Sequence, residues 1–281
     1  MGYGALVTGR RDPLPQIVLQ YADYAVWQRR WLTGARLAWQ LDYWREQLQG
    51  APPLVELPLD RARREDGEFQ AGVVRWQLDA GLSARLRQLA RESETTLFVT
   101  PLAAYAVLLS RFGNAGDIVI GTAVANRYAV ETEARIGFFV NTLPLRLRWR
   151  ERATFRELQA SAHKAAVGAY AHPYVPFDQI VDALQPDRSA LFSPLFQTLF
   201  TLQNVPKRER ALPGLAAAAV ELERPTAGAT FDLTLSLTDA GGPLYGALEF
   251  NAALFDISTI ERMAADFRTV PADIFRTGTH L

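Results

Sequence analysis

Histidine most often serves as the general base near neutral pH, and this sequence of 281 residues has three: His163, His172 and His280. His163 stands beside Lys164 in a helical pattern, which favours a surface or packing role. His172 lies in a Tyr-Ala-His-Pro turn, where an imidazole can cap the preceding helix and fix the turn. His280 belongs to the tail. No two histidines are adjacent, so the sequence predicts structural histidines and no catalytic one.

Nucleophilic and metal chemistry have equally little support. No serine stands in a Gly-x-Ser-x-Gly elbow, and a serine hydrolase would also need a base and an oxyanion hole. The absence of cysteine excludes thiolate nucleophiles, disulfides and cysteine metal sites. No histidine spacing suits a metal, and Gly241-Gly242 lacks the residues that follow in a phosphate loop. We therefore predict no catalytic residue and no metal ligand in this chain.

The most informative polar groups lie in residues 135–146, which read Arg-Ile-Gly-Phe-Phe-Val-Asn-Thr-Leu-Pro-Leu-Arg. Gly137 and Asn141 interrupt an otherwise apolar, strand-forming run. A glycine in a strand indicates a bulge or a close backbone approach. A buried asparagine must find hydrogen-bond partners. The pattern predicts a strand that leaves the core to line a cavity, although a core amide remains an alternative for Asn141.

Composition bounds the remaining classes. Thirty basic and thirty acidic residues cancel, which gives no electrostatic support for binding nucleic acid or an anionic membrane. Apolar residues make up 49% of the chain, as in ordinary globular proteins, and the length suits one large domain or two small ones. No apolar run is long enough to span a membrane, and the N-terminus lacks a signal-peptide pattern. These features fit a cytoplasmic protein.

The elements that must position these residues mix helices and strands. Apolar spacing predicts helices at residues 21–33, 36–49, 82–89, 97–112, 154–170, 176–184 and 258–267, with a capping box at Thr154 and Glu157. Strands are predicted at residues 73–78, 117–125 and 195–203, residues 136–149 are expected to form a long strand or a strand pair, and a hairpin joins 231–237 to 244–250. Residues 207–229 are expected to form an irregular crossover. The pattern is typical of a layered α/β sandwich with a mixed sheet.

Three further stretches belong with residues 135–146. Residues 21–28 read Tyr-Ala-Asp-Tyr-Ala-Val-Trp-Gln, residues 172–178 read His-Pro-Tyr-Val-Pro-Phe-Asp, and residues 187–197 read Asp-Arg-Ser-Ala-Leu-Phe-Ser-Pro-Leu-Phe-Gln. In this order, the four stretches resemble the motifs of the condensation domains of nonribosomal peptide synthetases. A weaker resemblance covers nearly the whole chain.

The resemblance implies a chloramphenicol-acetyltransferase-like α/β fold. Condensation domains consist of two such halves around a tunnel, and this chain resembles the C-terminal one. On this basis we expect residues 1–20 to be a lead-in from the missing N-terminal half, residues 21–268 to be the C-terminal subdomain, and residues 269–281 to be an atypical tail. Pro271 is expected to break the last helix. Such ends suggest a gene fragment, a frame-shifted gene or an excised piece.

The resemblance also assigns positions residue by residue. Tunnel or motif positions fall on Arg127, Gly137, Phe139, Asn141, Thr142, His172, Pro176 and Phe177. Structural motif positions fall on Tyr21, Asp23, Trp27, Arg188, Pro194, Phe196 and Gln197. In the family, the arginine matching Arg127 pairs with the aspartate of a His-His-x-x-x-Asp-Gly motif. Without that aspartate, we expect Arg127 to be solvated or to pair with a nearby carboxylate, since an unpaired buried charge is costly.

The His-His-x-x-x-Asp-Gly motif itself does not occur in this sequence. The family forms amide bonds between acyl and aminoacyl thioesters carried on the phosphopantetheine arms of carrier proteins, and this motif supplies the histidine. We therefore expect no condensation activity from this chain alone, and no cofactor bound directly. The implied partners are carrier proteins and the missing half or adjoining modules. Two alternatives stay open: a non-catalytic module that binds carrier proteins, and a coenzyme-A-dependent acyltransferase of the same fold.

Overall fold

The computed structural model describes residues 2–11, 17–64, 70–113, 116–186, 189, 191–204 and 229–277. The helices in this part are α1 (Gly2–Val7), α2 (Tyr21–Trp31), α3 (Gly34–Leu48), α4 (Ala80–Glu92), α5 (Val99–Ser110), α6 (Val130–Glu133), α7 (Phe155–Ala171), α8 (Phe177–Leu184) and α9 (Ile257–Thr277). The strands are β1 (Ala71–Gln77), β2 (Asp117–Val124), β3 (Asn141–Arg148), β4 (Thr198–Gln203), β5 (Leu233–Asp239) and β6 (Leu244–Asn251).

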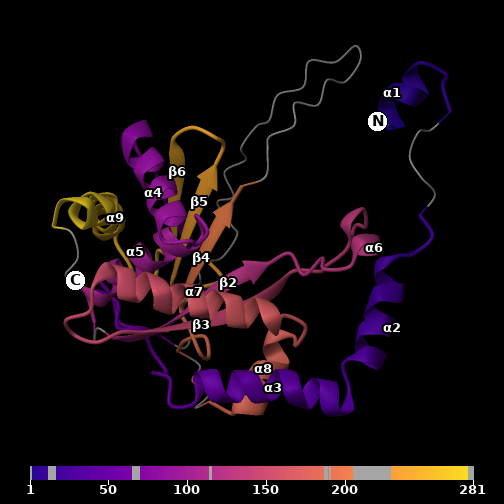
Figure 1. Ribbon diagram of the computed structural model, residues 1–281, viewed down its shortest axis with the longest axis horizontal. Helices are drawn as coiled ribbons and strands as arrows, with labels where there is room; N and C mark the ends of the chain where they lie inside the picture. Colours follow the sequence, from indigo (N-terminus) through magenta and orange to yellow (C-terminus); the bar gives the residue numbers. More distant parts are fainter. Residues whose placement is uncertain are drawn as a thin grey trace.

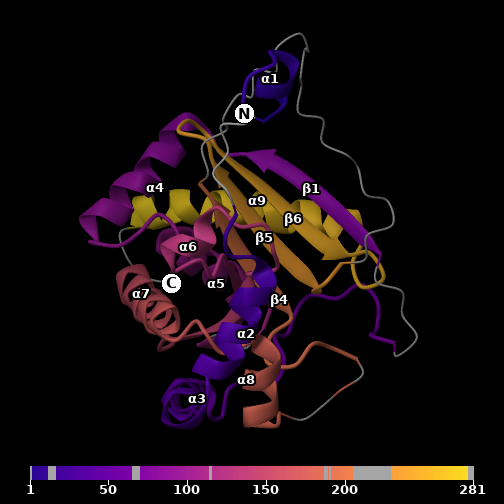
Figure 2. The same ribbon diagram turned by 90° about the vertical axis from the view of Figure 1, so that its right-hand side faces the viewer.

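The strands form one six-stranded mixed sheet in the order β1-β6-β5-β4-β2-β3. Strand β4 runs parallel to β2 and β5, whereas the remaining neighbours are antiparallel. The predicted hairpin is confirmed, because β5 and β6 pair from Leu233 with Phe250 to Asp239 with Leu244. Helix α7 packs on β3, α9 packs on β1, and α5 contacts both helices, so the three form a layer against the sheet (Figures 1 and 2). The predicted mixed α/β class is correct.

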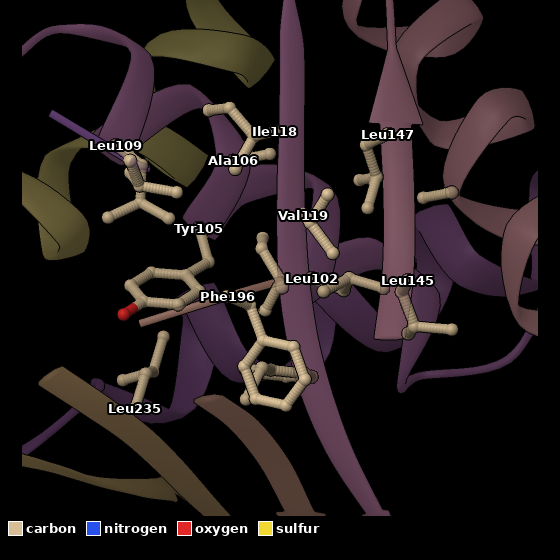
Figure 3. Close-up of a cluster of buried hydrophobic side chains, with 14 of the residues drawn as sticks. Leu102, Tyr105, Ala106, Leu109, Ile118, Val119, Leu145, Leu147, Phe196 and Leu235 are labelled. Carbon is tan, nitrogen blue, oxygen red and sulfur yellow. The ribbon is translucent and has the colours of Figure 1, made fainter. Parts of the chain in front are cut away.

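The core centres on α5, whose residues from Val99 to Leu109 are all buried. Figure 3 shows Leu102, Tyr105 and Leu109 among side chains of β2, β3 and β5. The sequence is apolar on every side of this helix, which is typical of a helix enclosed by other elements. The prediction of a buried helix at residues 97–112 is confirmed.

A second part of the molecule extends from this body. We call it the arm: α2 together with residues 125–140, which contain α6. Figure 1 shows α2 and α6 beyond the ends of β2 and β3, and Figure 2 shows the two helices near each other in a view turned by 90°. Helix α2 has no fully buried residue. The described residues of the arm include one buried apolar side chain, Phe139, so the arm has no extended core and depends mainly on contacts of that ring with half-buried side chains of α2.

The structure corrects two local predictions. Residues 136–140 are not a strand, because β2 ends at Val124 opposite Asn141, and no strand continues the pairing beyond that point. Helix α9 continues through Pro271 to Thr277. A proline removes one backbone donor, but its fixed φ is helical, so the hydrogen bonds on either side can carry the helix past it. The predicted crossover at residues 207–229 lies almost wholly outside the described residues.

Candidate functional site

Aromatic rings hold α2 against the second half of the arm. The ring of Tyr21 meets that of Phe139 edge-on at 5.1 Å, and Tyr24 lies 4.8 Å from the same ring. Further along α2, Trp27 stacks on Trp31 at 5.2 Å. Such pairs contribute about 0.5–1.5 kcal/mol each beyond the burial of their surface. Asp23 accepts a hydrogen bond from the backbone N–H of residue 20 at 2.8 Å and so caps the start of α2.

Gly137 is a point of close approach between the two halves of the arm. A Cβ atom at this position would lie 2.6 Å from Cδ2 and 2.7 Å from Cβ of Tyr21. Only glycine admits this approach without displacing the tyrosine. The sequence therefore signalled a close backbone approach correctly, although the segment around the glycine is not a strand.

Asn141 opens β3 and ties it to the turn before α8. Its Nδ2 donates to the carbonyls of Pro173 at 2.9 Å and Val175 at 2.8 Å, and its Oδ1 accepts from the N–H of Thr142. The half-buried amide is thus fully hydrogen-bonded within the chain. Asn141 fixes the position of Pro176, the N-cap of α8.

His172 ends α7 and is nearly enclosed. Its Nδ1 lies 2.9 Å from the carbonyl oxygen of Gly168, and its ring stacks on Tyr43 of α3 at 4.0 Å, with 4° between the planes. Burial raises the pKa of Tyr43 to about 12, so this tyrosine stays neutral near pH 7. The His172 carbonyl accepts from Nε1 of Trp44 at 3.2 Å. These contacts bind α3 to the end of α7.

Three of the four motifs meet around a hollow of about 310 Å³, which we call the motif hollow. It is lined by Tyr21, Tyr24, Gln28, Asn126, Phe138, Phe139, Val140, Asn141, Thr142, Pro176, Phe177 and Asp178. A volume of this size, lined by aromatic and apolar side chains together with amide, hydroxyl and carboxylate groups, suits a small ligand or part of a larger one. A second hollow of about 400 Å³ lies on the other side of Tyr24 and Phe139, and its lining includes Asp23, Trp27 and Thr132.

Arg127 does not have the environment expected of it. Its guanidinium donates to the carbonyl of Thr132 and lies 4.2 Å from the centre of the Phe139 ring. No carboxylate of the described residues pairs with it, and it is half-buried rather than fully solvated. The expectation of solvation or a borrowed carboxylate was therefore wrong, because a cation can be stabilised by a ring face and a carbonyl instead.

The fourth motif lies mostly away from the motif hollow. The side chain of Gln197 accepts from the N–H of Val55 at 2.8 Å and donates to the carbonyls of Pro53 and Ser193, so it fixes the loop after α3. Phe196 is fully buried and contacts the ring of Phe177 at 5.1 Å. Pro194 lines a separate hollow near the ends of α3 and α8. Arg188 lies outside the described residues.

Arg146, the last residue of the motif on β3, has a structural function that the sequence did not reveal. Its guanidinium pairs with Asp117 on β2 at 2.5 and 2.7 Å. It also donates to the carbonyls of Gln47, Gln49 and Gly50, which lie at and just beyond the end of α3. Only the folded structure brings these groups together, since they lie about a hundred residues away along the chain.

The sequence also missed some groups that line the motif hollow. Asn126 is buried with a positive φ of 52°, and asparagine tolerates this left-handed conformation better than most residues. Its position next to Arg127 was the sequence signal that could have identified Asn126 as a residue of the hollow. Burial and the nearby Tyr21 raise the pKa of Tyr24, so its hydroxyl remains protonated at neutral pH. His163, by contrast, is far along α7, where its Nδ1 meets the Thr95 hydroxyl at 2.9 Å.

Comparison with known proteins decides the family. The model of the condensation domain matches residues 1–280. The chain belongs to the condensation-domain family. It is 42% identical over 272 residues to one of the linear gramicidin synthase subunits of Brevibacillus parabrevis, a match that covers 97% of this chain and 5% of that protein. It is also 42% identical over 260 residues to malpinin synthetase of Mortierella alpina, covering 92% of this chain and 3% of that synthetase.

Solved structures share the fold of this condensation-domain chain. The X-domain from teicoplanin biosynthesis, solved in complex with OxyB, has a TM-score of 0.86 and 31% identity, and the match covers 97% of this chain and 61% of that one. The condensation domain of the polyketide synthase MokA has a TM-score of 0.80 at 23% identity, which supports the fold alone. The chain thus spans about three-fifths of these solved chains. Among its described residues, no helix is both long and apolar enough to cross a membrane.

Proposed function

We propose that this chain is the C-terminal part of a nonribosomal peptide synthetase condensation domain and that it forms no amide bond by itself. One observation carries the proposal: the chain matches the condensation-domain model over residues 1–280, while its sequence contains no His-His-x-x-x-Asp-Gly motif. Proton transfer by a positioned base typically contributes 10²–10⁴-fold to a rate. A chain without that base provides a binding surface for the reaction and lacks its proton acceptor.

The reaction would join two substrates that arrive on carrier proteins in the cytoplasm. The amine of the acceptor attacks the thioester carbonyl of the donor, a C–N bond forms, the C–S bond breaks, and the thiol of the donor's phosphopantetheine arm leaves. The amine loses a proton, which the histidine of the missing motif would accept and pass to the departing sulfur, so that the thiol is released. The chain's own contribution is the motif hollow and the arm beside it, where Tyr21, Phe139 and Asn141 fix the geometry.

The test is complementation between separate halves. This chain, an N-terminal half carrying His-His-x-x-x-Asp-Gly, and two loaded carrier proteins are combined, and the amide product is measured by mass spectrometry. We expect product only when both halves are present. The matched control is an N-terminal half whose second motif histidine is replaced by alanine. Product from this chain without any N-terminal half would refute the proposal.

A second function has one observation in its favour. The X-domain that shares this fold at a TM-score of 0.86 was solved in complex with another protein, OxyB. The alternative is therefore a non-catalytic module that binds a carrier protein or another partner of the assembly line. Calorimetry with an unloaded carrier protein separates the two functions. Binding without product, even when an active N-terminal half is added, would favour the module.

A further inference from the structure

Asn126 is the buried polar side chain of the motif hollow that keeps an unpaired atom. The residue is 7% exposed, and its Oδ1 has no hydrogen-bond partner among the described residues. Its Nδ2 donates to the hydroxyl of Tyr24 at 3.4 Å, which is a long hydrogen bond. Leaving a buried amide atom unpaired typically costs about 1–3 kcal/mol, so the arrangement calls for an explanation.

The Tyr24 hydroxyl is the hydrogen-bond partner of this carboxamide among the described residues. In the observed orientation Nδ2 donates to it, which leaves Oδ1 as the unpaired atom. The side-chain amides of Asn141 and Gln28 line the same hollow but donate to backbone carbonyls instead.

The backbone at this position does not itself require a carboxamide. Asn126 follows the end of β2 at φ 52°, a conformation that glycine adopts more easily than asparagine. Asparagine thus occupies a position whose backbone conformation glycine would adopt more easily. The χ2 torsion of asparagine is soft, so the carboxamide can turn its unpaired atom toward the hollow when a ligand enters.

We propose that the carboxamide of Asn126 binds a secondary amide of the acyl-carrying arm in the motif hollow. A carboxamide accepts from an N–H and donates to a C=O, which are the two groups that a secondary amide presents. The apolar side chains of Phe139 and Pro176 line the same hollow as Asn126, and apolar surroundings strengthen such a bond. This inference rests on the proposed function, which brings pantetheine-borne acyl groups to this half of the domain.

Two sources could supply the amide: the pantetheine arm and the peptide chain that it carries. The experiment therefore uses two series of probes with the full chain. The first series consists of S-methylpantetheine and analogues of it, in each of which an ester replaces one of the amides. The other is a dipeptide thioether of N-acetylcysteamine and its depsipeptide analogue. Binding is measured by calorimetry for the wild type and for Asn126→Gly, which removes the carboxamide and suits the left-handed backbone.

We expect the effect of replacing an amide in the probe to depend on whether Asn126 is present in the protein. In one series, the change from amide to ester should weaken binding to the wild type by roughly three- to tenfold, as for loss of one hydrogen bond. The same change should leave binding to Asn126→Gly unaltered. The series that shows the coupling identifies the source of the amide. Glu94→Gly is the matched control, because Glu94 also has a positive φ, of 50°, and does not line the hollow.

Equal losses for both proteins in both series would overturn the inference and would mean that water satisfies Asn126. Failure of the wild type to bind any probe would overturn it as well. Complementation with the N-terminal half distinguishes failure of this inference from failure of the proposed function. Unchanged KM values for Asn126→Gly with normal product formation would contradict the inference alone. No product from the wild type would contradict the proposed function, whereas the calorimetric coupling would still decide whether Asn126 binds an amide.

Discussion

Helices α5 and α2 have similar lengths, 12 and 11 residues, but opposite environments. Nearly all of α5 is buried in the body, whereas α2 has no buried residue and packs half-exposed rings on the buried ring of Phe139. Burial of apolar surface stabilises α5, and a capping carboxylate and aromatic pairs stabilise α2. Three of the four family motifs border the arm, so the residues that resemble functional ones lie where the fold is least enclosed.

This difference predicts two separate effects of substitution. Changes in the body should lower the free energy of unfolding of the whole chain. Changes in the arm should alter the hollow and complementation while costing less stability, because regions with few buried contacts open locally at low cost. Residues on such exposed segments are often the ones that carry function.

The largest effect is expected for Phe196→Ala in the body. The ring is fully buried, lies 5.1 Å from Phe177 and 5.3 Å from Phe231, and fills the space that Gly121 leaves open. Removing a buried phenylalanine side chain costs about 3–5 kcal/mol. Urea unfolding followed by circular dichroism measures this loss. The control in the arm is Phe138→Ala, which is 78% exposed and should change stability by no more than about 0.5 kcal/mol.

The body was also the part that the sequence predicted well. Apolar residues on all sides of α5, alternation in β5 and β6, and the Thr154 and Glu157 capping box are local signals, and each corresponds to an observed element. Such signals suffice because the periodicity of a buried face can be recognised from consecutive residues alone.

The arm and the motif hollow could be predicted only in part. Residues 136–140 have strand-forming side chains, but Ile136 is 95% exposed and no strand pairs with it. Asn141 finds its acceptors 32 and 34 residues away, and Asn126 meets Tyr24 across about a hundred residues of chain. No local pattern encodes such pairings. Family resemblance located most of these residues, and the structure was needed to show what each one contacts.

In the arm, Gly137→Ala should have the next largest effect. The new Cβ would lie 2.6 Å from the Tyr21 ring, so α2 must move away from residues 136–140. Overpacking of this kind typically costs about 1–3 kcal/mol. Complementation should fall more steeply than stability. Gly242→Ala is the control, since a Cβ there meets no atom within 4 Å. Equal complementation by both variants would show that the arm does not shape the site.

Arg127→Ala should cost about 1–2 kcal/mol, because it removes a charged hydrogen bond to the Thr132 carbonyl and a cation–π contact with Phe139. The matched comparison is Arg36→Ala. Arg36 likewise lies over a ring, that of Trp31 at 4.4 Å, and donates to a backbone carbonyl, but it is exposed. Its loss should be smaller. A negligible effect of Arg127→Ala would indicate that neither the hydrogen bond to Thr132 nor the contact with Phe139 stabilises the fold.

The smallest effect concerns Asp239, the last residue of β5, and it depends on pH. Arg87 of α4 donates to this carboxylate at 2.7 Å, and together with the N–H of Gly241 it holds the pKa of Asp239 below its ordinary value. A lowered pKa in the folded state stabilises the fold above the ordinary pKa of about 3.9 and loses that effect as pH falls through the folded value. Asp239→Asn should therefore cost up to about 1 kcal/mol at pH 7, after allowance for screening by solvent, and the cost should shrink as pH falls below about 4.

Asp42→Asn, which breaks the exposed pair with Arg45, should cost little at either pH. Urea titrations at both pH values measure the difference, and a cost for Asp239→Asn that is the same at both would show that the turn is held by its backbone rather than by this ion pair.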